Sequence, residues 1–260
     1  KYTKCPKCNK KAIRETDTFD TFFESSWYFA RFTDLNPSSA FTEEAVNYWM
    51  PVDQYIGGVE HAVMHLLYSR FFMRALKHVN SINLEEPFTS LQTQGMVCHQ
   101  TFKTDKDHWV FPSDVVKKDN KYFHSQTKEP VIAGRTEKMS KSKKNVVDPQ
   151  QIIDDFGADT ARFFMLSDSP PNRDMEWSDS GVEGSWRFLN KLWKFVKSLP
   201  NKNIKYGLPT NISLKNRELL TFMNTTIKDV TKAIDEFHFN IAVAQIRSLF
   251  NLVSSYKIEN

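Results

Sequence analysis

The chain has 260 residues, of which 40% are hydrophobic and 25% charged, values typical of a globular protein with one large or two small domains. No apolar run approaches the roughly 20 residues of a membrane-spanning helix, and no signal peptide is recognisable, so we expect a soluble cytoplasmic protein without a membrane partner. The net charge of +4 permits a polyanionic partner but does not require one.

The N-terminal segment contains two of the three cysteines. Cys5 and Cys8 form a Cys-x-x-Cys sequence, a spacing at which two thiolates can bind one side of a tetrahedral zinc ion. A closed site needs two further ligands, and no second pair follows, so a turn without metal is the simpler interpretation. The alternative is a zinc half-site whose partner ligands precede residue 1. We assign residues 1–16 to a linker or zinc-knuckle remnant, and we interpret the chain as a fragment.

Residues 17–100 mix short apolar runs with helical patterns, which is typical of α/β units. The run 55–58 ends at a glycine pair and is followed by hydrophobic residues at helical spacing, from Val59 to Leu76. A strand, a glycine turn and a helix in this order let a backbone approach a nucleotide closely. Residues 101–136 are mostly polar and charged, and their length predicts a small inserted β-rich module or a long loop.

From Asp148 onward the pattern is helical. Asp148 as the N-cap and Pro149 in the first turn predict a helix start, and Gly157 predicts its end, before a second short helix over 158–166. Three long amphipathic helices are predicted after Trp177, with a linker over 200–212 between the first two. Their apolar stripes comprise Val182, Trp186, Leu189, Trp193 and Val196, then Leu220, Met223, Ile227, Val230, Ile234 and Phe237, then Ile246, Leu249, Phe250, Val253 and Tyr256.

The most specific motif is Lys138-Met139-Ser140-Lys141-Ser142, which is followed by two more lysines and Asn145. Several ammonium groups and two hydroxyls on a mobile loop before a capped helix could bind a triphosphate and stabilise a departing pyrophosphate. An arbitrary run of lysine and serine would be interpreted as a solvated basic loop. This pentapeptide, however, resembles the KMSKS signature of class I aminoacyl-tRNA synthetases.

Three further segments resemble the leucyl-tRNA synthetases within that class: 17–29, 55–68 and 94–97. Isoleucyl and valyl enzymes share the KMSKS motif, but the isoleucyl enzymes have an acid-Gln-His run where this chain has Glu60-His61. The resemblance is strong over 15–100 and 135–190, and over 200–260 it extends only to helical character.

The resemblance implies an α/β fold, namely the second half of a Rossmann-like class I synthetase catalytic domain with a small insertion, followed by an all-α helical bundle. The implied domains are the catalytic half (17–100), the inserted module (101–136), the KMSKS loop with connecting helices (137–176), and the start of an anticodon-binding helical domain (177–260). It also implies that the KMSKS segment and the glycine pair at 57–58 meet on one nucleotide cleft.

The implied activity is ATP-dependent ligation of leucine to tRNA(Leu) through leucyl-adenylate, with ATP and Mg²⁺ as cofactors, by a monomer. The His-x-Gly-His signature of the first catalytic half does not occur in these 260 residues, and no editing module is recognisable. We therefore expect this chain to carry half of the active site and to form no leucyl-adenylate alone, which a pyrophosphate-exchange assay would test.

The resemblance assigns a role to each matching position. Lys138 and Lys141 would act on the phosphates as the catalytic residues, and no metal ligand is assigned. The ATP-binding residues would be Gly57, Gly58, Glu60, His61, Gln94, Met96, Val97, Met139, Ser140 and Ser142. Gly58 would admit the adenosine, Glu60 would accept hydrogen bonds from the ribose, and Val97 would offer backbone groups to the adenine. The leucine-binding residues would be Phe22, Ser25, Tyr55 and His65. Phe22 and Met96 could instead be ordinary core residues.

Other interpretations compete for two features. His61 and His65 share a helix face and could bind zinc, but in zinc proteases the Glu follows the first His, whereas Glu60 precedes it here. Satisfied core histidines are a second alternative to substrate-facing groups. A metal-dependent hydrolase built on the two histidines is accordingly a remote possibility. The main alternative function is a non-catalytic, nucleic-acid-binding derivative of a class I synthetase.

Basic residues lie off the apolar stripe of the first long helix. They are Arg187, Lys191, Lys194 and Lys197, with Arg162 and Arg173 shortly before. Such residues usually form only a solvated face, but in a tRNA enzyme some would contact backbone phosphates. Neutralising Lys191 and Lys194 should then weaken tRNA binding and flatten its dependence on salt, and an unchanged salt slope would leave the solvated face.

Overall fold

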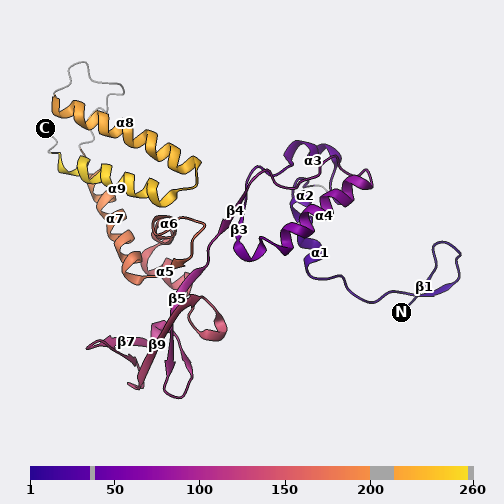
Figure 1. The fold of residues 1–260 in the computed structure, drawn as a ribbon, viewed down its shortest axis with the longest axis horizontal. Helices are drawn as coiled ribbons and strands as arrows, with labels where there is room; N and C mark the ends of the chain where they lie inside the picture. The colour runs from indigo at the N-terminus through magenta and orange to yellow at the C-terminus, as the bar shows by residue number, and fades with distance from the viewer. Residues whose placement is uncertain (36–38, 200–213, 257–260) are drawn as a thin grey trace. The chain divides into compact units, whose positions relative to one another are not determined.

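The computed structural model describes residues 1–35, 39–199 and 214–256, so the predicted linker at 200–212 lies outside the described residues (Figure 1). The chain divides into two compact units, residues 1–93 and 94–260, and each is described here by itself. Among the described helices, none combines the length and the apolarity needed to cross a membrane.

The first unit contains short strands and four α-helices among its described residues. Its elements are β1 (Tyr2–Lys4), β2 (Lys11–Ile13), α1 (Phe22–Ser25), α2 (Tyr28–Arg31), α3 (Glu43–Trp49), β3 (Tyr55–Gly58), the 3₁₀ turn η1 (Val59–His61), α4 (Met64–His78) and β4 (Leu91–Gln94). Strands β1 and β2 form an antiparallel hairpin around the Cys-x-x-Cys turn, and β3 pairs with β4. The predicted order of strand, glycine pair and helix over 55–78 is confirmed.

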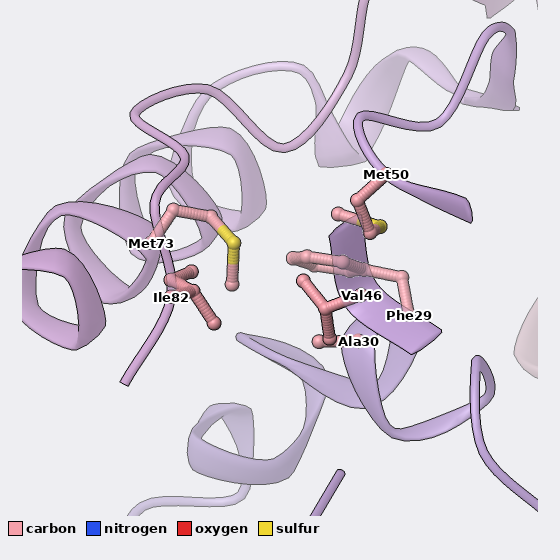
Figure 2. Close-up of a cluster of buried hydrophobic side chains, with 6 residues drawn as sticks. All are labelled: Phe29, Ala30, Val46, Met50, Met73 and Ile82. Atoms are coloured by element: carbon pink, nitrogen blue, oxygen red, sulfur yellow. The ribbon is translucent and has the colours of Figure 1, made fainter. Parts of the chain in front are cut away.

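The core of this unit lies between α2, α3 and α4 (Figure 2). Its buried side chains are Phe29, Ala30, Val46, Met50, Met73 and Ile82. Helix α3 is placed by its N-cap, because the Thr42 side chain accepts a hydrogen bond from the Ala45 N–H.

Helix α4 carries hydrophobic residues on two faces. His65, Ser69 and Met73 are buried, whereas Leu67 is 62% exposed and Phe71 is 69% exposed. The hydrophobic residues at helical spacing in the sequence therefore divide between the core and the surface of this unit. Periodicity alone did not distinguish these two faces, because polar His65 and Ser69 occupy the buried one.

The second unit combines a sheet with five α-helices in the described residues. Its elements are β5 (Val97–Thr104), β6 (Trp109–Val110), η2 (Pro112–Asp114), β7 (Val115–Lys118), β8 (Lys121–His124), β9 (Pro130–Lys138), η3 (Lys141–Lys143), α5 (Pro149–Phe156), α6 (Ala158–Ser167), β10 (Met175–Glu176), α7 (Asp179–Ser198), α8 (Leu214–Asp235) and α9 (Phe239–Ser255).

The sheet has the strand order β10-β5-β9-β8-β7, with β6 paired to β5. Strand β10 runs parallel to β5 and pairs Met175 with Val97, while β5, β9, β8 and β7 pair antiparallel. Residues 101–136, predicted as an inserted module, form β6 to β8, half of β5 and most of β9, around a core of Phe102, Val110 and Val131. Both long strands continue across the predicted module boundaries.

The helix signals around residue 150 are confirmed. The Asp148 side chain accepts a hydrogen bond from the Gln150 N–H at 2.9 Å, and Pro149 is the first residue of α5. Gly157 ends α5 with φ of 86°, a conformation that favours glycine, and α6 begins at the next residue.

The three long helices form at the predicted places, but two details of the predicted stripes are wrong. Helices α8 and α9 run side by side (Figure 1). Phe188 of α7 packs edge-on against Phe250 of α9. Helix α9 thus contacts the face of α7 that carries Phe188. In the predicted apolar stripe, by contrast, Trp193 is 63% exposed and Trp186 is 43% exposed. Helix α8 ends before Phe237, whose φ is 59°, because the His238 N–H donates back to the Ala233 carbonyl.

Candidate active site

The cationic segment predicted to bind phosphates begins at the end of β9 and leads into α5. Lys138 is the last residue of β9, and Lys141 begins the short turn η3. The Met139 N–H donates to the Val97 carbonyl at 3.1 Å, which attaches the start of the loop to β5. The two predicted serines contact each other, with 2.7 Å between the Ser140 and Ser142 hydroxyl oxygens.

The lysines of this segment differ in their contacts. Lys143 forms an ion pair with Glu137, and the Lys144 ammonium lies 5.3 Å from the ring centre of Phe111. Lys141 is exposed and lines a cavity of about 790 Å³ that also borders His99 and Asp148. Of these three cations, Lys141 is therefore the one placed to meet a ligand.

The segment around Gly95 is held by the loop that precedes β10. A side chain at Gly95 would come within 2.1 Å of the Arg173 carbonyl oxygen, so only glycine allows this approach of two backbones. The Met96 N–H donates to the Asp174 carboxylate at 2.7 Å. Because the Val97 carbonyl already accepts from Met139, an adenine at Val97 would use the second lone pair of that carbonyl or the N–H.

In the first unit, the predicted leucine-binding residues Tyr55 and His65 are hydrogen-bonded to each other. The Tyr55 hydroxyl lies 2.7 Å from His65 Nε2 and 2.6 Å from the hydroxyl of Tyr28. The Tyr55 ring stacks on Phe88 with 3.9 Å between ring centres. Tyr28 was missed as a site residue, although it lies within an aromatic segment, because nothing in the sequence indicated that its hydroxyl would reach Tyr55.

Burial shifts the acid–base properties of this hydrogen-bonded chain. Burial raises the pKa of Tyr55 well above its ordinary value, and the bond to Tyr28 adds to the effect. Burial also lowers the pKa of His65, assisted by the nearby His61. At neutral pH His65 is consequently an uncharged imidazole, able to share a proton with Tyr55 but carrying no charge towards a ligand.

Lowering the pH should destabilise the first unit through His65. Because the folded state holds the pKa of His65 below its unfolded value of about 6.5, the unfolded chain binds more protons at mildly acidic pH. The stabilising contribution is complete above about pH 6.5 and is lost progressively as the pH falls from there through the lower pKa of the folded state. Urea unfolding monitored by hydrogen exchange of α4 amides should show this loss of stability. The His65→Gln variant should lose less stability over the same fall in pH. The control is His78→Gln, an exposed histidine at the end of α4, and equal pH slopes in both variants would contradict the assignment.

The remaining predicted leucine-side residues lie on α1. Phe22 is 42% exposed and stacks against Tyr68 with 6.3 Å between ring centres, so it is not an ordinary core residue of this unit. The Ser25 hydroxyl donates to the Phe22 carbonyl at 2.8 Å, which leaves its oxygen to accept one further bond.

The two glycines of the pair differ in what surrounds them. A side chain at Gly58 would lie 2.3 Å from the Glu60 carboxylate, whereas nothing lies within 4 Å of one built at Gly57. Gly57 therefore faces open space, and Gly58 allows Glu60 to fold back over the strand. His61 is exposed, with its ring centre 6.0 Å from that of His65.

The predicted site residues thus form two groups, one in each unit. Phe22, Ser25, Tyr55, Gly57, Gly58, Glu60, His61 and His65 belong to the first unit, and Gln94, Met96, Val97, Lys138, Met139, Ser140, Lys141 and Ser142 to the second. Gln94 is exposed at the end of β4. The meeting of both groups on one cleft stays a prediction.

The metal alternatives concern the cysteine pair and the histidine pair. Across the described ranges of the chain, no group of three or more histidine, cysteine or acidic side chains is arranged to hold a metal ion. Backbone N–H groups of Cys8 and Lys7 lower the pKa of the Cys5 thiol, which favours its thiolate. Zinc at Cys5 and Cys8 would need ligands beyond this pair.

Comparison with known proteins shows which class of protein the chain resembles. The family model for class I tRNA synthetases (I, L, M and V) matches residues 113–178. Two methionyl-tRNA synthetase structures from Mycobacterium tuberculosis, with 18% and 17% identity, share the fold at TM-scores of 0.50 and 0.51, over 80% and 85% of this chain and 35% and 36% of those chains. The chain is similar to class I tRNA synthetases, and the predicted fold class is confirmed.

Within that class the chain aligns with leucine--tRNA ligases along nearly all of its length. It is 54% identical to the leucine--tRNA ligase of Paramagnetospirillum magneticum over 253 residues, 96% of this chain and 29% of that protein. Identity to the Rickettsia canadensis ligase is 50%, over 98% of this chain and 30% of the relative. The structure titled as the ternary LeuRS-tRNA-LeuAMS complex of Agrobacterium radiobacter K84 matches at TM-score 0.76 and 31% identity, over 97% of this chain and 28% of that one. The chain thus spans about 30% of the length of these curated relatives.

Proposed function

We propose that this chain is a segment of an ATP-dependent ligase that joins leucine to tRNA(Leu) through leucyl-adenylate. The observation that carries the proposal is the arrangement of the segment 138–142 and the two lysines that follow it. Lys141 is exposed and lines a cavity, whereas Lys143 pairs with Glu137 and Lys144 lies over the Phe111 ring. We call the longer protein to which this segment would belong the parent ligase.

In the proposed first step, a carboxylate oxygen of leucine attacks the α-phosphorus of ATP, and the bond to the departing pyrophosphate breaks. Lys138 and Lys141 would balance the negative charge that develops on the pyrophosphate oxygens. In the second step, a terminal ribose hydroxyl of the tRNA attacks the leucyl carbonyl, and AMP departs. Neither step requires a side-chain nucleophile, so catalysis would consist mainly of positioning and charge stabilisation.

The first unit would hold the amino acid and the ribose. Phe22 offers an exposed ring to the leucine side chain, while Tyr55 and uncharged His65 present a polar edge without placing a charge beside it. Glu60 would accept hydrogen bonds from the ribose hydroxyls. Because the Glu60 carboxylate occupies the space at Gly58, the neighbouring Gly57, which faces open space, would leave room for the adenosine in place of Gly58. His61, exposed and near His65, would lie close to the reacting carboxylate.

Magnesium would share the phosphate charge with the two lysines. Mg²⁺ in nucleotide enzymes is commonly held by substrate phosphates together with one or two carboxylates and water. The donor set of the loop, ammonium groups and hydroxyls, fits phosphate oxygens directly and suits a metal that is carried on the nucleotide.

The basic face of α7 would contact the tRNA backbone. Arg187, Lys194 and Lys197 are exposed on this helix, although Arg187 is paired with Glu183. The Lys191 ammonium lies 5.4 Å from the ring centre of Phe250, so it already contacts an aromatic ring of α9. Lys194 is therefore the better candidate of the two lysines for a phosphate contact.

A segment exchange tests the proposed function. The 253 matching residues of the Paramagnetospirillum magneticum ligase would be replaced by this chain, and the chimera assayed for leucine-dependent pyrophosphate exchange and for charging of tRNA(Leu). We expect both activities with leucine and much weaker exchange with isoleucine or methionine. A folded chimera that activates no leucine would refute the proposal, and tRNA binding without activation would favour the non-catalytic derivative.

A further inference from the structure

The side chain of Asn145, directly after Lys143 and Lys144, is fully buried and lies within hydrogen-bonding distance of four backbone groups. Its Oδ1 accepts from the Ser140 N–H at 2.8 Å. Its Nδ2 lies within bonding distance of three backbone carbonyls, those of His99 at 3.1 Å, Glu137 at 3.1 Å and Lys138 at 3.3 Å. One amide therefore connects strand β5, the end of β9 and the loop.

We propose that Asn145 is a positioning residue that sets the geometry of the loop 138–142 for the phosphates of ATP, an inference that rests on the proposed function. The bonds of Asn145 reach both sides of Met139, at the Lys138 carbonyl and the Ser140 N–H. Lys138 is itself one of the two anchored residues, and Lys141 follows the other directly. The amide thereby determines where the backbone carrying both catalytic lysines leaves the sheet.

An amide is the side chain that this position requires. Asparagine supplies one acceptor and two N–H donors within one short, planar group. Aspartate has no donor when ionised, and its charge would face three carbonyl oxygens. Leucine has the same branching at Cγ but would leave one N–H and three carbonyls buried without this partner, at a cost for each group.

The contacts of the residues around Asn145 divide the loop into a base that is bonded to the sheet and a tip that is exposed. At the base, Lys143 pairs with Glu137, Met139 bonds to Val97, and Asn145 bonds to β5 and β9. At the tip, Lys141 and Ser142 are exposed. Loss of the Asn145 bonds should therefore displace both lysines while leaving the leucine-binding residues of the first unit unchanged.

The decisive variant is Asn145→Asp in the parent ligase, assayed by leucine-dependent pyrophosphate exchange. We expect the KM for ATP to rise and kcat to fall, with a combined loss of roughly 100-fold at pH 8, because misplacement by about 1 Å is that costly. The KM for leucine should stay unchanged. The matched control is Asn120→Asp, the same change at an exposed turn residue between β7 and β8.

A pH profile distinguishes positioning from a general structural role. Protonated aspartate regains one donor and one acceptor, so the activity of Asn145→Asp relative to wild type should recover as the pH falls from 8 to 6. The ratio is needed because His99, Glu137, Lys138 and Lys143 lie around the amide and titrate or carry charge in both proteins. Asn145→Leu should show the loss without recovery.

The outcomes separate this inference from the proposed function. A wild-type parent ligase without leucine-dependent exchange would refute the function. An active wild type with an unchanged KM for ATP in Asn145→Asp, or with a loss confined to kcat and independent of pH, would overturn the positioning role. If Asn145→Asp does not fold, Asn145→Ser replaces it and the KM for ATP decides. In the 260-residue chain itself, hydrogen exchange at the Ser140 amide should accelerate in Asn145→Asp, and unchanged protection would contradict the bond.

Discussion

Replacing Lys141 with alanine in the parent ligase should lower kcat/KM for leucine-dependent pyrophosphate exchange by roughly 100- to 1,000-fold, the usual cost of removing one preorganised group that stabilises transition-state charge. The Lys141 side chain is exposed at the start of η3 and lines the cavity beside α5. Most of the loss should appear in kcat, because the pyrophosphate charge develops fully only in the transition state.

The matched control for Lys141→Ala is Lys118→Ala. Lys118 is exposed on β7, in the same unit, and faces Lys121 across the hairpin rather than any predicted site residue. Its removal changes the net charge equally but should leave exchange kinetics within about twofold, since isolated surface charges act weakly at a distance in salt. Equal losses in the two variants would show that Lys141 contributes only general charge.

Replacing Met73 with alanine in the 260-residue chain should destabilise the first unit by about 2–5 kcal/mol, the cost typical of truncating a fully buried methionine. Met73 is 0% exposed and packs in the cluster between α2, α3 and α4. Helix propensity cannot account for such a loss, because alanine is the better helix former. Urea unfolding monitored by hydrogen exchange of α4 amides would measure it.

Helix α4 provides an unusually close control in Met64→Ala. The substitution is chemically identical and the helix is the same, but Met64 is 52% exposed. Its effect should stay within about 0.5 kcal/mol, as for most surface substitutions. If Met64→Ala were as destabilising as Met73→Ala, the division of α4 into a buried and an exposed face would be wrong.

Local chemistry explains which parts of the fold the sequence predicted correctly. Asp148, Pro149 and Gly157 each act on their own neighbours, through a cap, a fixed φ and a positive φ, so their effects can be inferred from the sequence alone. Phe237 could not be inferred in this way. It adopts a conformation that usually needs glycine, and its ring contacts Phe239 after the turn.

The site shows the same distinction between local and distant partners. The cationic segment was recognisable because its residues are consecutive, and the glycine pair because close backbone approach has a local signature. The Tyr28–Tyr55 bond joins residues 27 positions apart, and the bond from Asn145 to His99 spans 46 positions. Such contacts depend on how strands and helices pack, which periodicity does not specify.

The two-residue strand β10 has a consequence for communication within the second unit. Met175 and Trp177 donate to the carbonyls of Met96 and Cys98, and α7 begins only two residues later. A shift of the α7 N-terminus therefore either breaks these bonds or moves the 96–98 backbone with it. A displacement of α7 on binding a polyanion would in this way move the start of β5, the strand proposed to contact adenine.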